Sequence, residues 1–380
     1  SISNTVADCK SMDWSGVLNA PTFDVSNSLS IYGSFTLVDN MTLSGGSSIS
    51  FKSISAGNTI SFSGHSSNRS IYFDGIGGEW TMQDSIILTN KFSTIIIDEG
   101  TVHTAGYTVQ TGGLVVRTPS TINFSSSNII ILSDFKLYSP NVNSSTSTIY
   151  LRSERNDYCS SDVLLNNLIN ETTIASNNTL KGTGSYNKII HRGTSTLKLE
   201  DISSDSIIVD PGKTLQLGGT VTVNDYLEMN GTCSLLSNLT GTGTLSSSTG
   251  NIVVNHTNIA NITATGGASF VANDSYDLGG NSGWTINSTT AKDYYWVGDG
   301  GSWEDGSHWA LTSGGAGSGC VPTFQDDVYF DANSFSTSGQ TVSVSGSVAD
   351  CKSMDWTGVT NAPTFDVSNS LIVYGSFTLV

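Results

Sequence analysis

The residues best suited to chemistry are acidic side chains between positions 300 and 335. Glu304, Asp305 and His308 lie within one span of five residues. A second acidic group, Asp326, Asp327 and Asp331, falls in the run DDVYFD. The first group could bind a metal ion, and the second could hold a structural Ca²⁺ through its carboxylate oxygens. The competing interpretation is that these residues hold turns and strand edges, which is a common role of Asp in glycine-rich loops.

Catalytic residues are not predicted. The enzyme alternative is a β-helical polysaccharide lyase or glycosidase, which needs paired carboxylates or a basic–acidic cluster on one face. The chain has only 15 Lys and Arg and 5 scattered His. Glycine runs such as GTGTL (241–245) follow no helix-forming segment and indicate turns rather than a nucleotide-binding loop. We therefore expect a protein that is not an enzyme.

These residues lie beside a long internal repeat. Residues 6–38 return at 348–380 with four differences, at an offset of 342 residues (351 − 9, for the cysteine of CKSMDW). A weaker match continues back through 1–5 and 343–347. Internal repeats decide the architecture of a chain. We expect the sequence to hold one full repeat of about 342 residues and the opening of the next.

Composition excludes some partners. Charged residues are 12% of the chain, and the net charge is −17 with a pI near 4.4. Nucleic-acid binding needs a basic surface, so a nucleic-acid partner is not expected. No apolar run is long enough for a membrane span. The 14 Phe, 13 Tyr and 7 Trp with only 6 Pro argue for an ordered chain.

Short alternating strands fill the sequence and are broken by Gly, Ser or Asn. Examples are RSIYFDG (69–75), STIIIDEG (93–100) and STLKLED (195–201). Nearly 300 residues of this texture predict an all-β parallel β-solenoid, in which rungs of roughly 20–25 residues stack inward apolar side chains. An array of β-sandwich domains is the alternative. One segment, SSDVLLNNLIN (160–170), has spacing that would suit a turn or two of helix.

Four segments follow from the repeat and the composition. Residues 1–38 start a repeat unit and correspond to 343–380, and residues 39–289 form the solenoid body. Residues 290–347 form a Trp/Gly-rich junction between tandem units, and residues 348–380 start the next repeat. Tryptophan buries a large area. We therefore expect the tryptophans in and beside the junction to pack it, namely Trp14, Trp296, Trp303, Trp309 and Trp356.

The junction and its flanks resemble a known module. YYWVGDGGSWEDGSHW, GCVPTFQDDVYFDANSF, CKSMDWTGVTNAPTF and NSGWTIN (281–287) are similar to the recurring unit of very large secreted and surface proteins of Bacteroidota-type bacteria. Those proteins contain tandem β-solenoid repeats and are regarded as adhesins or surface fibres. The resemblance is concentrated in 281–380 and 1–38, and residues 39–280 share only the strand texture.

The resemblance also implies a disulfide arrangement. Cys320 and Cys351 recur together in the family-like motif, which implies that they pair. Cys9, equivalent to Cys351, would then bond to the preceding repeat, and Cys159 would pair with Cys233 as the two that remain. The alternative is a set of free buried thiols.

Glycan attachment is a further expectation. Twelve N-x-S/T sequons occur, among them Asn40 and Asn68, but this number is close to chance for such a composition. The bacterial resemblance implies O-glycans at the Asp-Ser-aliphatic sites of Ser85 and Ser206 as the stronger candidates.

The sequence thus predicts a structural or adhesive fibre at the cell surface or outside the cell. Its partner would be the protein itself, head to tail, with surface glycans or other cells as further partners. An array of carbohydrate-binding modules is the alternative, with Trp80 and the junction tryptophans as stacking platforms for sugars.

Overall fold

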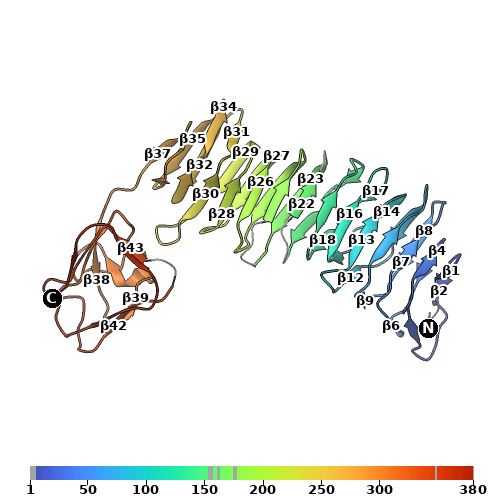
Figure 1. The fold of residues 1–380 in the computed structure, drawn as a ribbon, viewed down its shortest axis with the longest axis horizontal. Coiled ribbons are helices and arrows are strands. Elements are labelled where there is room, and N and C mark those ends of the chain that lie inside the picture. Colours follow the sequence, from blue (N-terminus) through green and yellow to red (C-terminus); the bar gives the residue numbers. More distant parts are fainter. Residues whose placement is uncertain (1–5, 153–156, 161–162, 174–177, 347–348, 380) are drawn as a thin grey trace.

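A computed structural model describes residues 6–152, 157–160, 163–173, 178–346 and 349–379 (Figure 1). Parallel strands stack in it as a β-solenoid of about 18 turns, which confirms the predicted fold class. The described residues contain one short 3₁₀ helix, η1 (Gly306–His308). The solenoid runs from the blue N-terminal rungs to the gold strands near residue 287 in Figure 1, and the orange and red segments lie beyond its end.

Alternation within each strand explains the stacking. In residues 129–131, Ile129 and Ile131 are 0% exposed and point inward, whereas Ile130 points outward. Side chains alternate between the two faces of a strand, so three successive isoleucines fill one inner ladder and one outer ladder. Parallel pairing then places like residues above one another, as at Ile71 over Ile49 and under Ile95.

Three long sheets form the walls of the body. The first has fourteen strands in the described chain: β1 (Ala7–Cys9), β4 (Leu29–Ile31), β7 (Ile49–Phe51), β10 (Ile71–Phe73), β13 (Thr94–Ile97), β16 (Gly113–Val116), β19 (Phe135–Leu137), β22 (Asp157–Ser160), β24 (Asn178–Lys181), β26 (Leu197–Glu200), β28 (Thr214–Leu217), β30 (Ser237–Gly241), β33 (Thr257–Ala260) and β36 (Tyr276–Asp277). The second has seven: β2 (Met12–Asp13), β5 (Phe35–Thr36), β8 (Asn58–Ser61), β11 (Glu79–Met82), β14 (Thr101–His103), β17 (Thr121–Asn123) and β20 (Val142–Asn143). The third has eleven: β9 (Ser66–Ser67), β12 (Ile86–Leu88), β15 (Val109–Thr111), β18 (Asn128–Ile131), β21 (Thr148–Leu151), β23 (Leu164–Asn170), β25 (Ser185–His191), β27 (Ile202–Val209), β29 (Thr220–Met229), β31 (Thr244–Ser247) and β34 (Thr263–Gly266).

Two short sheets complete the body. They consist of β3 (Thr22–Asp24) with β6 (Thr42–Ser44), and of β32 (Asn251–Asn255), β35 (Ser269–Asn273) and β37 (Thr285–Asn287).

The rungs change shape near residue 143. The seven-stranded sheet ends at β20, and from β23 to β29 the strands of the third sheet lengthen to between 7 and 10 residues. In β23 the inward residues Leu165 and Leu168 flank two outward residues, Asn166 and Asn167. The strand therefore turns a corner and serves two walls.

The same corner explains one wrong prediction. Leu165 and Leu168 are three residues apart, a spacing that also suits a helix. The described residues of 160–170 instead form parts of β22 and β23, because each half of the bent strand pairs with its neighbours in the stack.

A second hydrophobic core follows the body. One core extends over buried residues from Phe23 to Ala272, and the other contains residues from Tyr294 to Trp356. The second core is built on β38 (Asp293–Trp296), β39 (Gly301–Ser302), β40 (Trp309–Ala310), β41 (Asp327–Tyr329), β42 (Thr341–Val344), β43 (Ala349–Cys351), β44 (Ser353–Asp355), β45 (Thr364–Val367), β46 (Leu371–Val373) and β47 (Phe377–Thr378). Its strands pair in parallel, except that β38 and β40 are antiparallel.

Candidate functional site

The junction tryptophans lie inside the second core. Trp296, Trp303 and Trp309 are at most 2% exposed, and the ring of Trp309 lies 5.0 Å from that of Trp296 and 4.7 Å from that of Trp303. Two indole N–H groups donate to backbone carbonyls, Trp296 to Asp299 at 2.6 Å and Trp309 to Trp303 at 2.8 Å. Edge-to-face rings and satisfied N–H groups make this cluster rigid.

The second copy of the repeat start packs directly on this cluster. Trp356 is 4% exposed and stacks on Phe330 with their ring centroids 3.7 Å apart. Strand β44, which precedes Trp356, pairs with β41 through Val328 and Met354. Lys352 reinforces the contact, since its ammonium lies 3.0 Å from the Asp327 carboxylate. The second copy of the repeat start thus stacks on the junction rung that carries Asp327 and Phe330.

The two copies of the repeat start adopt the same local structure. In the first, Cys9 pairs with Ile31 and Trp14 lies 5.2 Å from Phe23. In the second, the equivalent Cys351 pairs with Val373, and Trp356 lies 5.2 Å from Phe365.

The turn between their strands repeats as well. Asn19 and Ala20 have φ of 71° and 44°, and Asn361 and Ala362 have φ of 69° and 43°. Alanine rarely adopts positive φ, so the shared turn is a specific feature of the motif.

Their surroundings differ. In the first copy Phe35 and Leu37 are at most 1% exposed, because the rung of residues 39–62 covers them through β7 and β8. The equivalent Phe377 and Leu379 of the second copy are 49% and 61% exposed. On the opposite face, Trp356 is buried by the junction, whereas Trp14 is half-exposed. No described residue occupies, next to the first copy, the place that β41 takes next to the second.

The first group of candidate metal ligands has structural roles. Asp305 caps η1 by accepting a hydrogen bond from the Ser307 backbone N–H at 2.9 Å. The hydrogen bond from the Ser307 hydroxyl, and then this backbone bond, lower the pKa of Asp305. Glu304 accepts from the backbone N–H of Gly346 at 2.9 Å. His308 stacks on Trp296 and donates from Nδ1 to the carbonyl of Val297 at 2.8 Å.

The second group is also engaged separately. Asp326 is 5% exposed and accepts from the backbone N–H groups of Lys292 and Thr323, each at 2.8 Å. Asp327 pairs with Lys352, and Asp331 accepts from the Asn333 N–H at 2.8 Å. Within the described ranges no three His, Cys, Asp or Glu side chains are grouped as metal ligands. The geometry thus favours the turn and strand-edge interpretation over a calcium site.

The disulfide differs from the predicted arrangement. Cys233 bonds to Cys320 across a sequence separation of 87, so the predicted pairs Cys320–Cys351 and Cys159–Cys233 are both wrong. Cys233 lies in a tight turn between Thr232 and Leu235 that reaches from the body toward the junction loop with Cys320. Cys351 instead points into the second core and is 0% exposed, which removes it from that loop. Nothing is described of the Cys159 side chain.

Among the cysteines whose side chains are described, Cys9 and Cys351 are free thiols, and they occupy equivalent positions. Burial, with the charges of Asp350, Asp327 and Asp326, raises the pKa of Cys351 to about 12. The pKa of the half-exposed Cys9 is also raised, first by burial and then by Asp8. The predicted bond from Cys9 to a preceding repeat is the equivalent of the predicted Cys320–Cys351 pair. In the second copy of the repeat start, Cys351 points into a hydrophobic core and Cys320 bonds to Cys233 instead.

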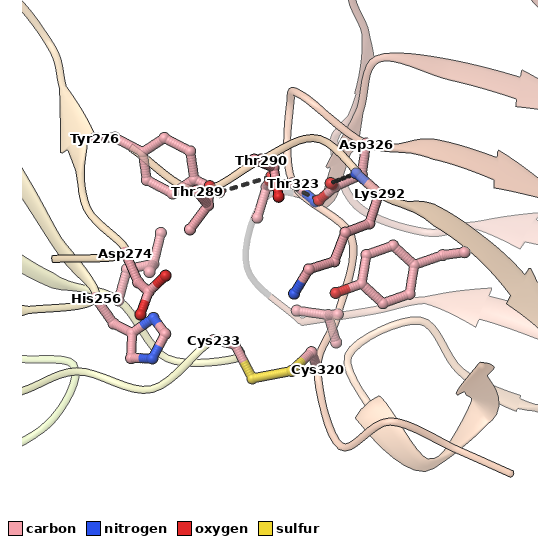
Figure 2. A pocket seen from close by; sticks show the side chains of 13 residues that line it. Cys233, His256, Asp274, Tyr276, Thr289, Thr290, Lys292, Cys320, Thr323 and Asp326 are labelled. Carbon is pink, nitrogen blue, oxygen red and sulfur yellow. Dashed lines mark hydrogen bonds between the residues drawn. A yellow bond between two sulfur atoms is a disulfide. The ribbon is translucent and has the colours of Figure 1, made fainter. Parts of the chain in front are cut away.

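Contacts beside the disulfide tie the body to the second core (Figure 2). The Tyr276 hydroxyl lies 3.0 Å from that of Thr323, and the Tyr276 ring packs 5.1 Å from Phe324. Asp326 completes the connection by holding Thr323 and the backbone of Lys292 (Figure 2). Sequence reasoning missed Tyr276, since its pattern is that of any strand residue.

Two clefts flank the disulfide. A cleft of about 240 Å³ is lined by His256 and Asp274 from the body and by Lys292 and Asp326 from the other side (Figure 2). A cleft of about 540 Å³ has Leu235, Trp303 and Glu304 among its walls. Both are open spaces between two structural units, and they mark where the units meet.

Candidate glycan acceptors differ in their access. Asn40 and Asn68 are exposed. Ser85 is half-buried, and its hydroxyl accepts from the Thr108 N–H at 3.2 Å. Ser206 is 4% exposed, which leaves no room for a glycan and contradicts its prediction as an acceptor.

Four other sequon asparagines stack on one another. Asn255 donates to Asn230 at 2.6 Å, Asn273 donates to Asn255 at 3.4 Å, and Asn287 donates to Asn273 at 2.8 Å. Because these side-chain amides bond to each other, their role is an amide ladder along the stack.

The tryptophans suggested as sugar platforms are not accessible. Trp80 is 0% exposed and packs against Phe73 and Phe51, and the junction tryptophans Trp296, Trp303 and Trp309 are buried as described. A stacking platform needs an exposed ring face. These residues therefore belong to the cores.

Comparison with protein-family models, with curated proteins and with solved structures gives no match. The described part of the chain has no helix with the length and apolar character of a membrane span.

Proposed function

We propose that this chain is a unit of an extracellular fibre, structural or adhesive, in which β-solenoid units follow one another head to tail. The observation that carries the proposal is the repeated segment. One sequence, 6–38 and again 348–380, folds alike twice, and its second copy lies on the junction rung through β41 and β44. The half-exposed face around Trp14 matches the face that the junction buries around Trp356.

Other features agree with an extracellular location. The Cys233–Cys320 disulfide is of a kind that persists in oxidising compartments. A net charge of −17 gives an acidic chain that resists random association. Within each body the mechanical basis of the fibre is the parallel ladder, which passes stress along backbone hydrogen bonds from rung to rung.

The test is a two-unit chain in which residues 1–347 are followed by residues 6–380. Small-angle scattering should show that the second unit lengthens the particle by a fixed increment, on the order of 70 Å for rungs about 4.8 Å apart. In this chain the face around Phe377 of the central repeat start becomes covered by the rung of residues 39–62. Units that behave as freely jointed beads would contradict the proposal.

Location and activity need separate measurements. Antibodies against the folded unit should label intact cells, and the size of the labelled band on a denaturing gel tells one long polypeptide from assembled subunits. Binding to a glycan array would favour the carbohydrate-binding alternative, and depolymerisation of surface polysaccharides would favour the enzyme. Labelling confined to permeabilised cells would overturn the extracellular assignment.

A further inference from the structure

The outer face of the eleven-stranded sheet carries an apolar stripe. We call it the outer stripe, and it consists of Ile130, Tyr150, Ile169, Ile190 and Ile208. Each of these residues pairs with the next in parallel register, so that they occupy five successive rungs. Gln110 precedes the stripe and Glu228 follows it. All five point away from the core, since their strand neighbours point inward.

The opposite wall has a shorter apolar run. Among its described residues, the outward column of the fourteen-stranded sheet has only Tyr72, Ile96 and Val115 as apolar residues in successive register, and it continues with Lys136 and later with Thr179, Lys198 and Gln216. A solvated sheet face normally alternates apolar inside with polar outside. The outer stripe departs from this rule over five successive rungs, against three on the other wall, and this length indicates an interface.

A column of alternating charge runs beside the outer stripe. It consists of Arg152, Glu171, Arg192 and Asp210, each placed two residues after a stripe residue. Their backbone N–H groups donate to the preceding rung at 2.9–3.0 Å, which keeps the column in register. Arg152 lies 2.9 Å from Glu171 and 5.2 Å from the Tyr150 ring. The order of signs along the axis is therefore plus, minus, plus, minus.

We propose that the outer stripe is a lateral interface that binds a second copy of this chain, with the two solenoid axes antiparallel. A two-fold axis along the strand direction, midway between the rungs of Ile169 and Ile190, places stripe against stripe, with Ile169 facing Ile190 of the second copy. It also places the charge column against its own reversed order. Arg152 then faces Asp210 of the second copy, and Glu171 faces Arg192, so that every pair has opposite sign. A parallel arrangement about an axis along the solenoid does not align the two charge columns.

The size of the surface sets the strength of the pairing. Five rungs about 4.8 Å apart and a width of about 15 Å give roughly 350 Å² on each copy. A stable interface buries about 800 Å² on each partner. Single units therefore pair weakly, at high protein concentration. If the fibre proposal holds, the contact repeats along both partners and bundles fibres by multivalency, but the pairing of single units does not depend on it.

Cross-linking of the full chain tests the contact. Ile169→Cys lies beside the two-fold axis, and Val115→Cys is a matched control because Val115 also points outward, on the other wall, and is likewise 9% exposed. Both are made with Cys9→Ser and Cys159→Ser and treated with a short bis-maleimide. We expect Ile169→Cys to give severalfold more covalent dimer than Val115→Cys. Equal yields, or no dimer from either, would overturn the proposal.

A second probe guards against a folding defect in the first. Asn167→Cys lies on the rung of Ile169 in a half-buried polar position, and Gln216→Cys is its control on the fourteen-stranded sheet. Retention of the Cys233–Cys320 disulfide and of the β-sheet circular dichroism signal reports folding. The Asn167 variant should also give the higher dimer yield.

Charge reversal tests the orientation. Glu171→Arg places two arginines opposite each other twice across the two-fold axis, so the yield of dimer should fall severalfold. Adding Arg192→Glu restores opposite signs and should restore the yield. An apolar contact without this orientation would be unaffected by either change, and that result would refute the antiparallel arrangement.

Discussion

At the scale of single residues, identical neighbours do not give identical chemistry. Cys9 and Cys351 both lie in the sequence ADCKSMDW, yet Cys351 is 0% exposed and Cys9 is half-exposed. Only the thiolate attacks an electrophile, so burial that raises the pKa to about 12 makes the Cys351 thiol inert at neutral pH.

We expect maleimide to label Cys9 much faster than Cys351 in the native chain. The reason is both access and the higher thiol pKa of Cys351. Peptide mass spectrometry after timed labelling measures the two rates, and labelling in denaturant supplies the control. Equal native rates would contradict the burial of Cys351.

A buried histidine should make the stability of the body depend on pH. His191 is 0% exposed, and burial, with a smaller effect of Lys213, lowers its pKa from 6.5 to about 4. Because the folded pKa is depressed, the unfolded chain binds the proton first. The associated stability is present above about pH 6.5 and falls until about pH 4, by about 3 kcal/mol at most.

The variant His191→Asn isolates this effect. Between pH 7.5 and pH 5 the free energy of unfolding should decrease less in the variant than in the original chain. Urea denaturation at the two pH values measures the decrease in each protein. Subtracting the decrease of the variant from that of the original chain cancels the contribution of the carboxylates that both share. An identical decrease would show that His191 takes up its proton in the folded state.

At the scale of elements, one rung exists in two environments. Strands β2 and β44 have the same sequence neighbours, but β44 pairs on both sides, with β41 and β47, whereas β2 pairs with β5 alone among the described strands. Burying both faces of a rung is what gives a solenoid its stability, since each rung contacts only its neighbours.

This predicts different costs for one substitution. Trp356→Ala removes a buried ring stacked on Phe330 and should cost about 3–5 kcal/mol in the second core. Trp14→Ala removes the half-exposed equivalent and should cost clearly less. Hydrogen exchange of the backbone amides of β44 and of β2 measures the free energy of local opening in each variant, so the two losses of stability can be compared directly. A larger loss at β2 would mean that the junction contributes little to burial.

The sequence predicts the elements better than their contacts. Inward and outward alternation in runs such as 129–131 is a local property, so the solenoid follows from it. The bend of β23 at Asn166 depends on pairing with neighbouring strands that are distant in the sequence. The spacing of Leu165 and Leu168 suits a helix as well, so the sequence alone does not reveal the bend. The disulfide was missed for a similar reason. No sequence pattern indicates that the turn at Cys233, which is followed by β30, β33 and β36 before the junction, reaches the loop of Cys320.

At the scale of the whole molecule, the body and the second core are joined by few contacts. These are the chain near Lys292, the Cys233–Cys320 bond, and the contacts of Tyr276 with Thr323 and Phe324. The disulfide is therefore the main constraint on how the two units are oriented, because the other contacts are single and partly solvated.

Reduction should loosen this orientation without unfolding either unit. We expect small-angle scattering of the Cys320→Ala variant to show a broader distribution of interatomic distances than the original chain. Its circular dichroism spectrum should be unchanged. Cys9→Ala, which removes a thiol outside the contact, serves as the control. Unchanged scattering would mean that the noncovalent contacts are sufficient.

The same bond has a consequence for a fibre under tension. A force applied between the two ends passes from Cys233 to Cys320 through the sulfur atoms, so the intervening rungs and the tryptophan cluster bear none of it. In an oxidising medium this segment cannot be pulled out. In a reducing one it adds slack on the order of 300 Å for a separation of 87 residues. Stretching single molecules with and without reductant should reveal this added length. The Cys233–Cys320 disulfide would thus limit the extension of the fibre according to the redox state of its surroundings.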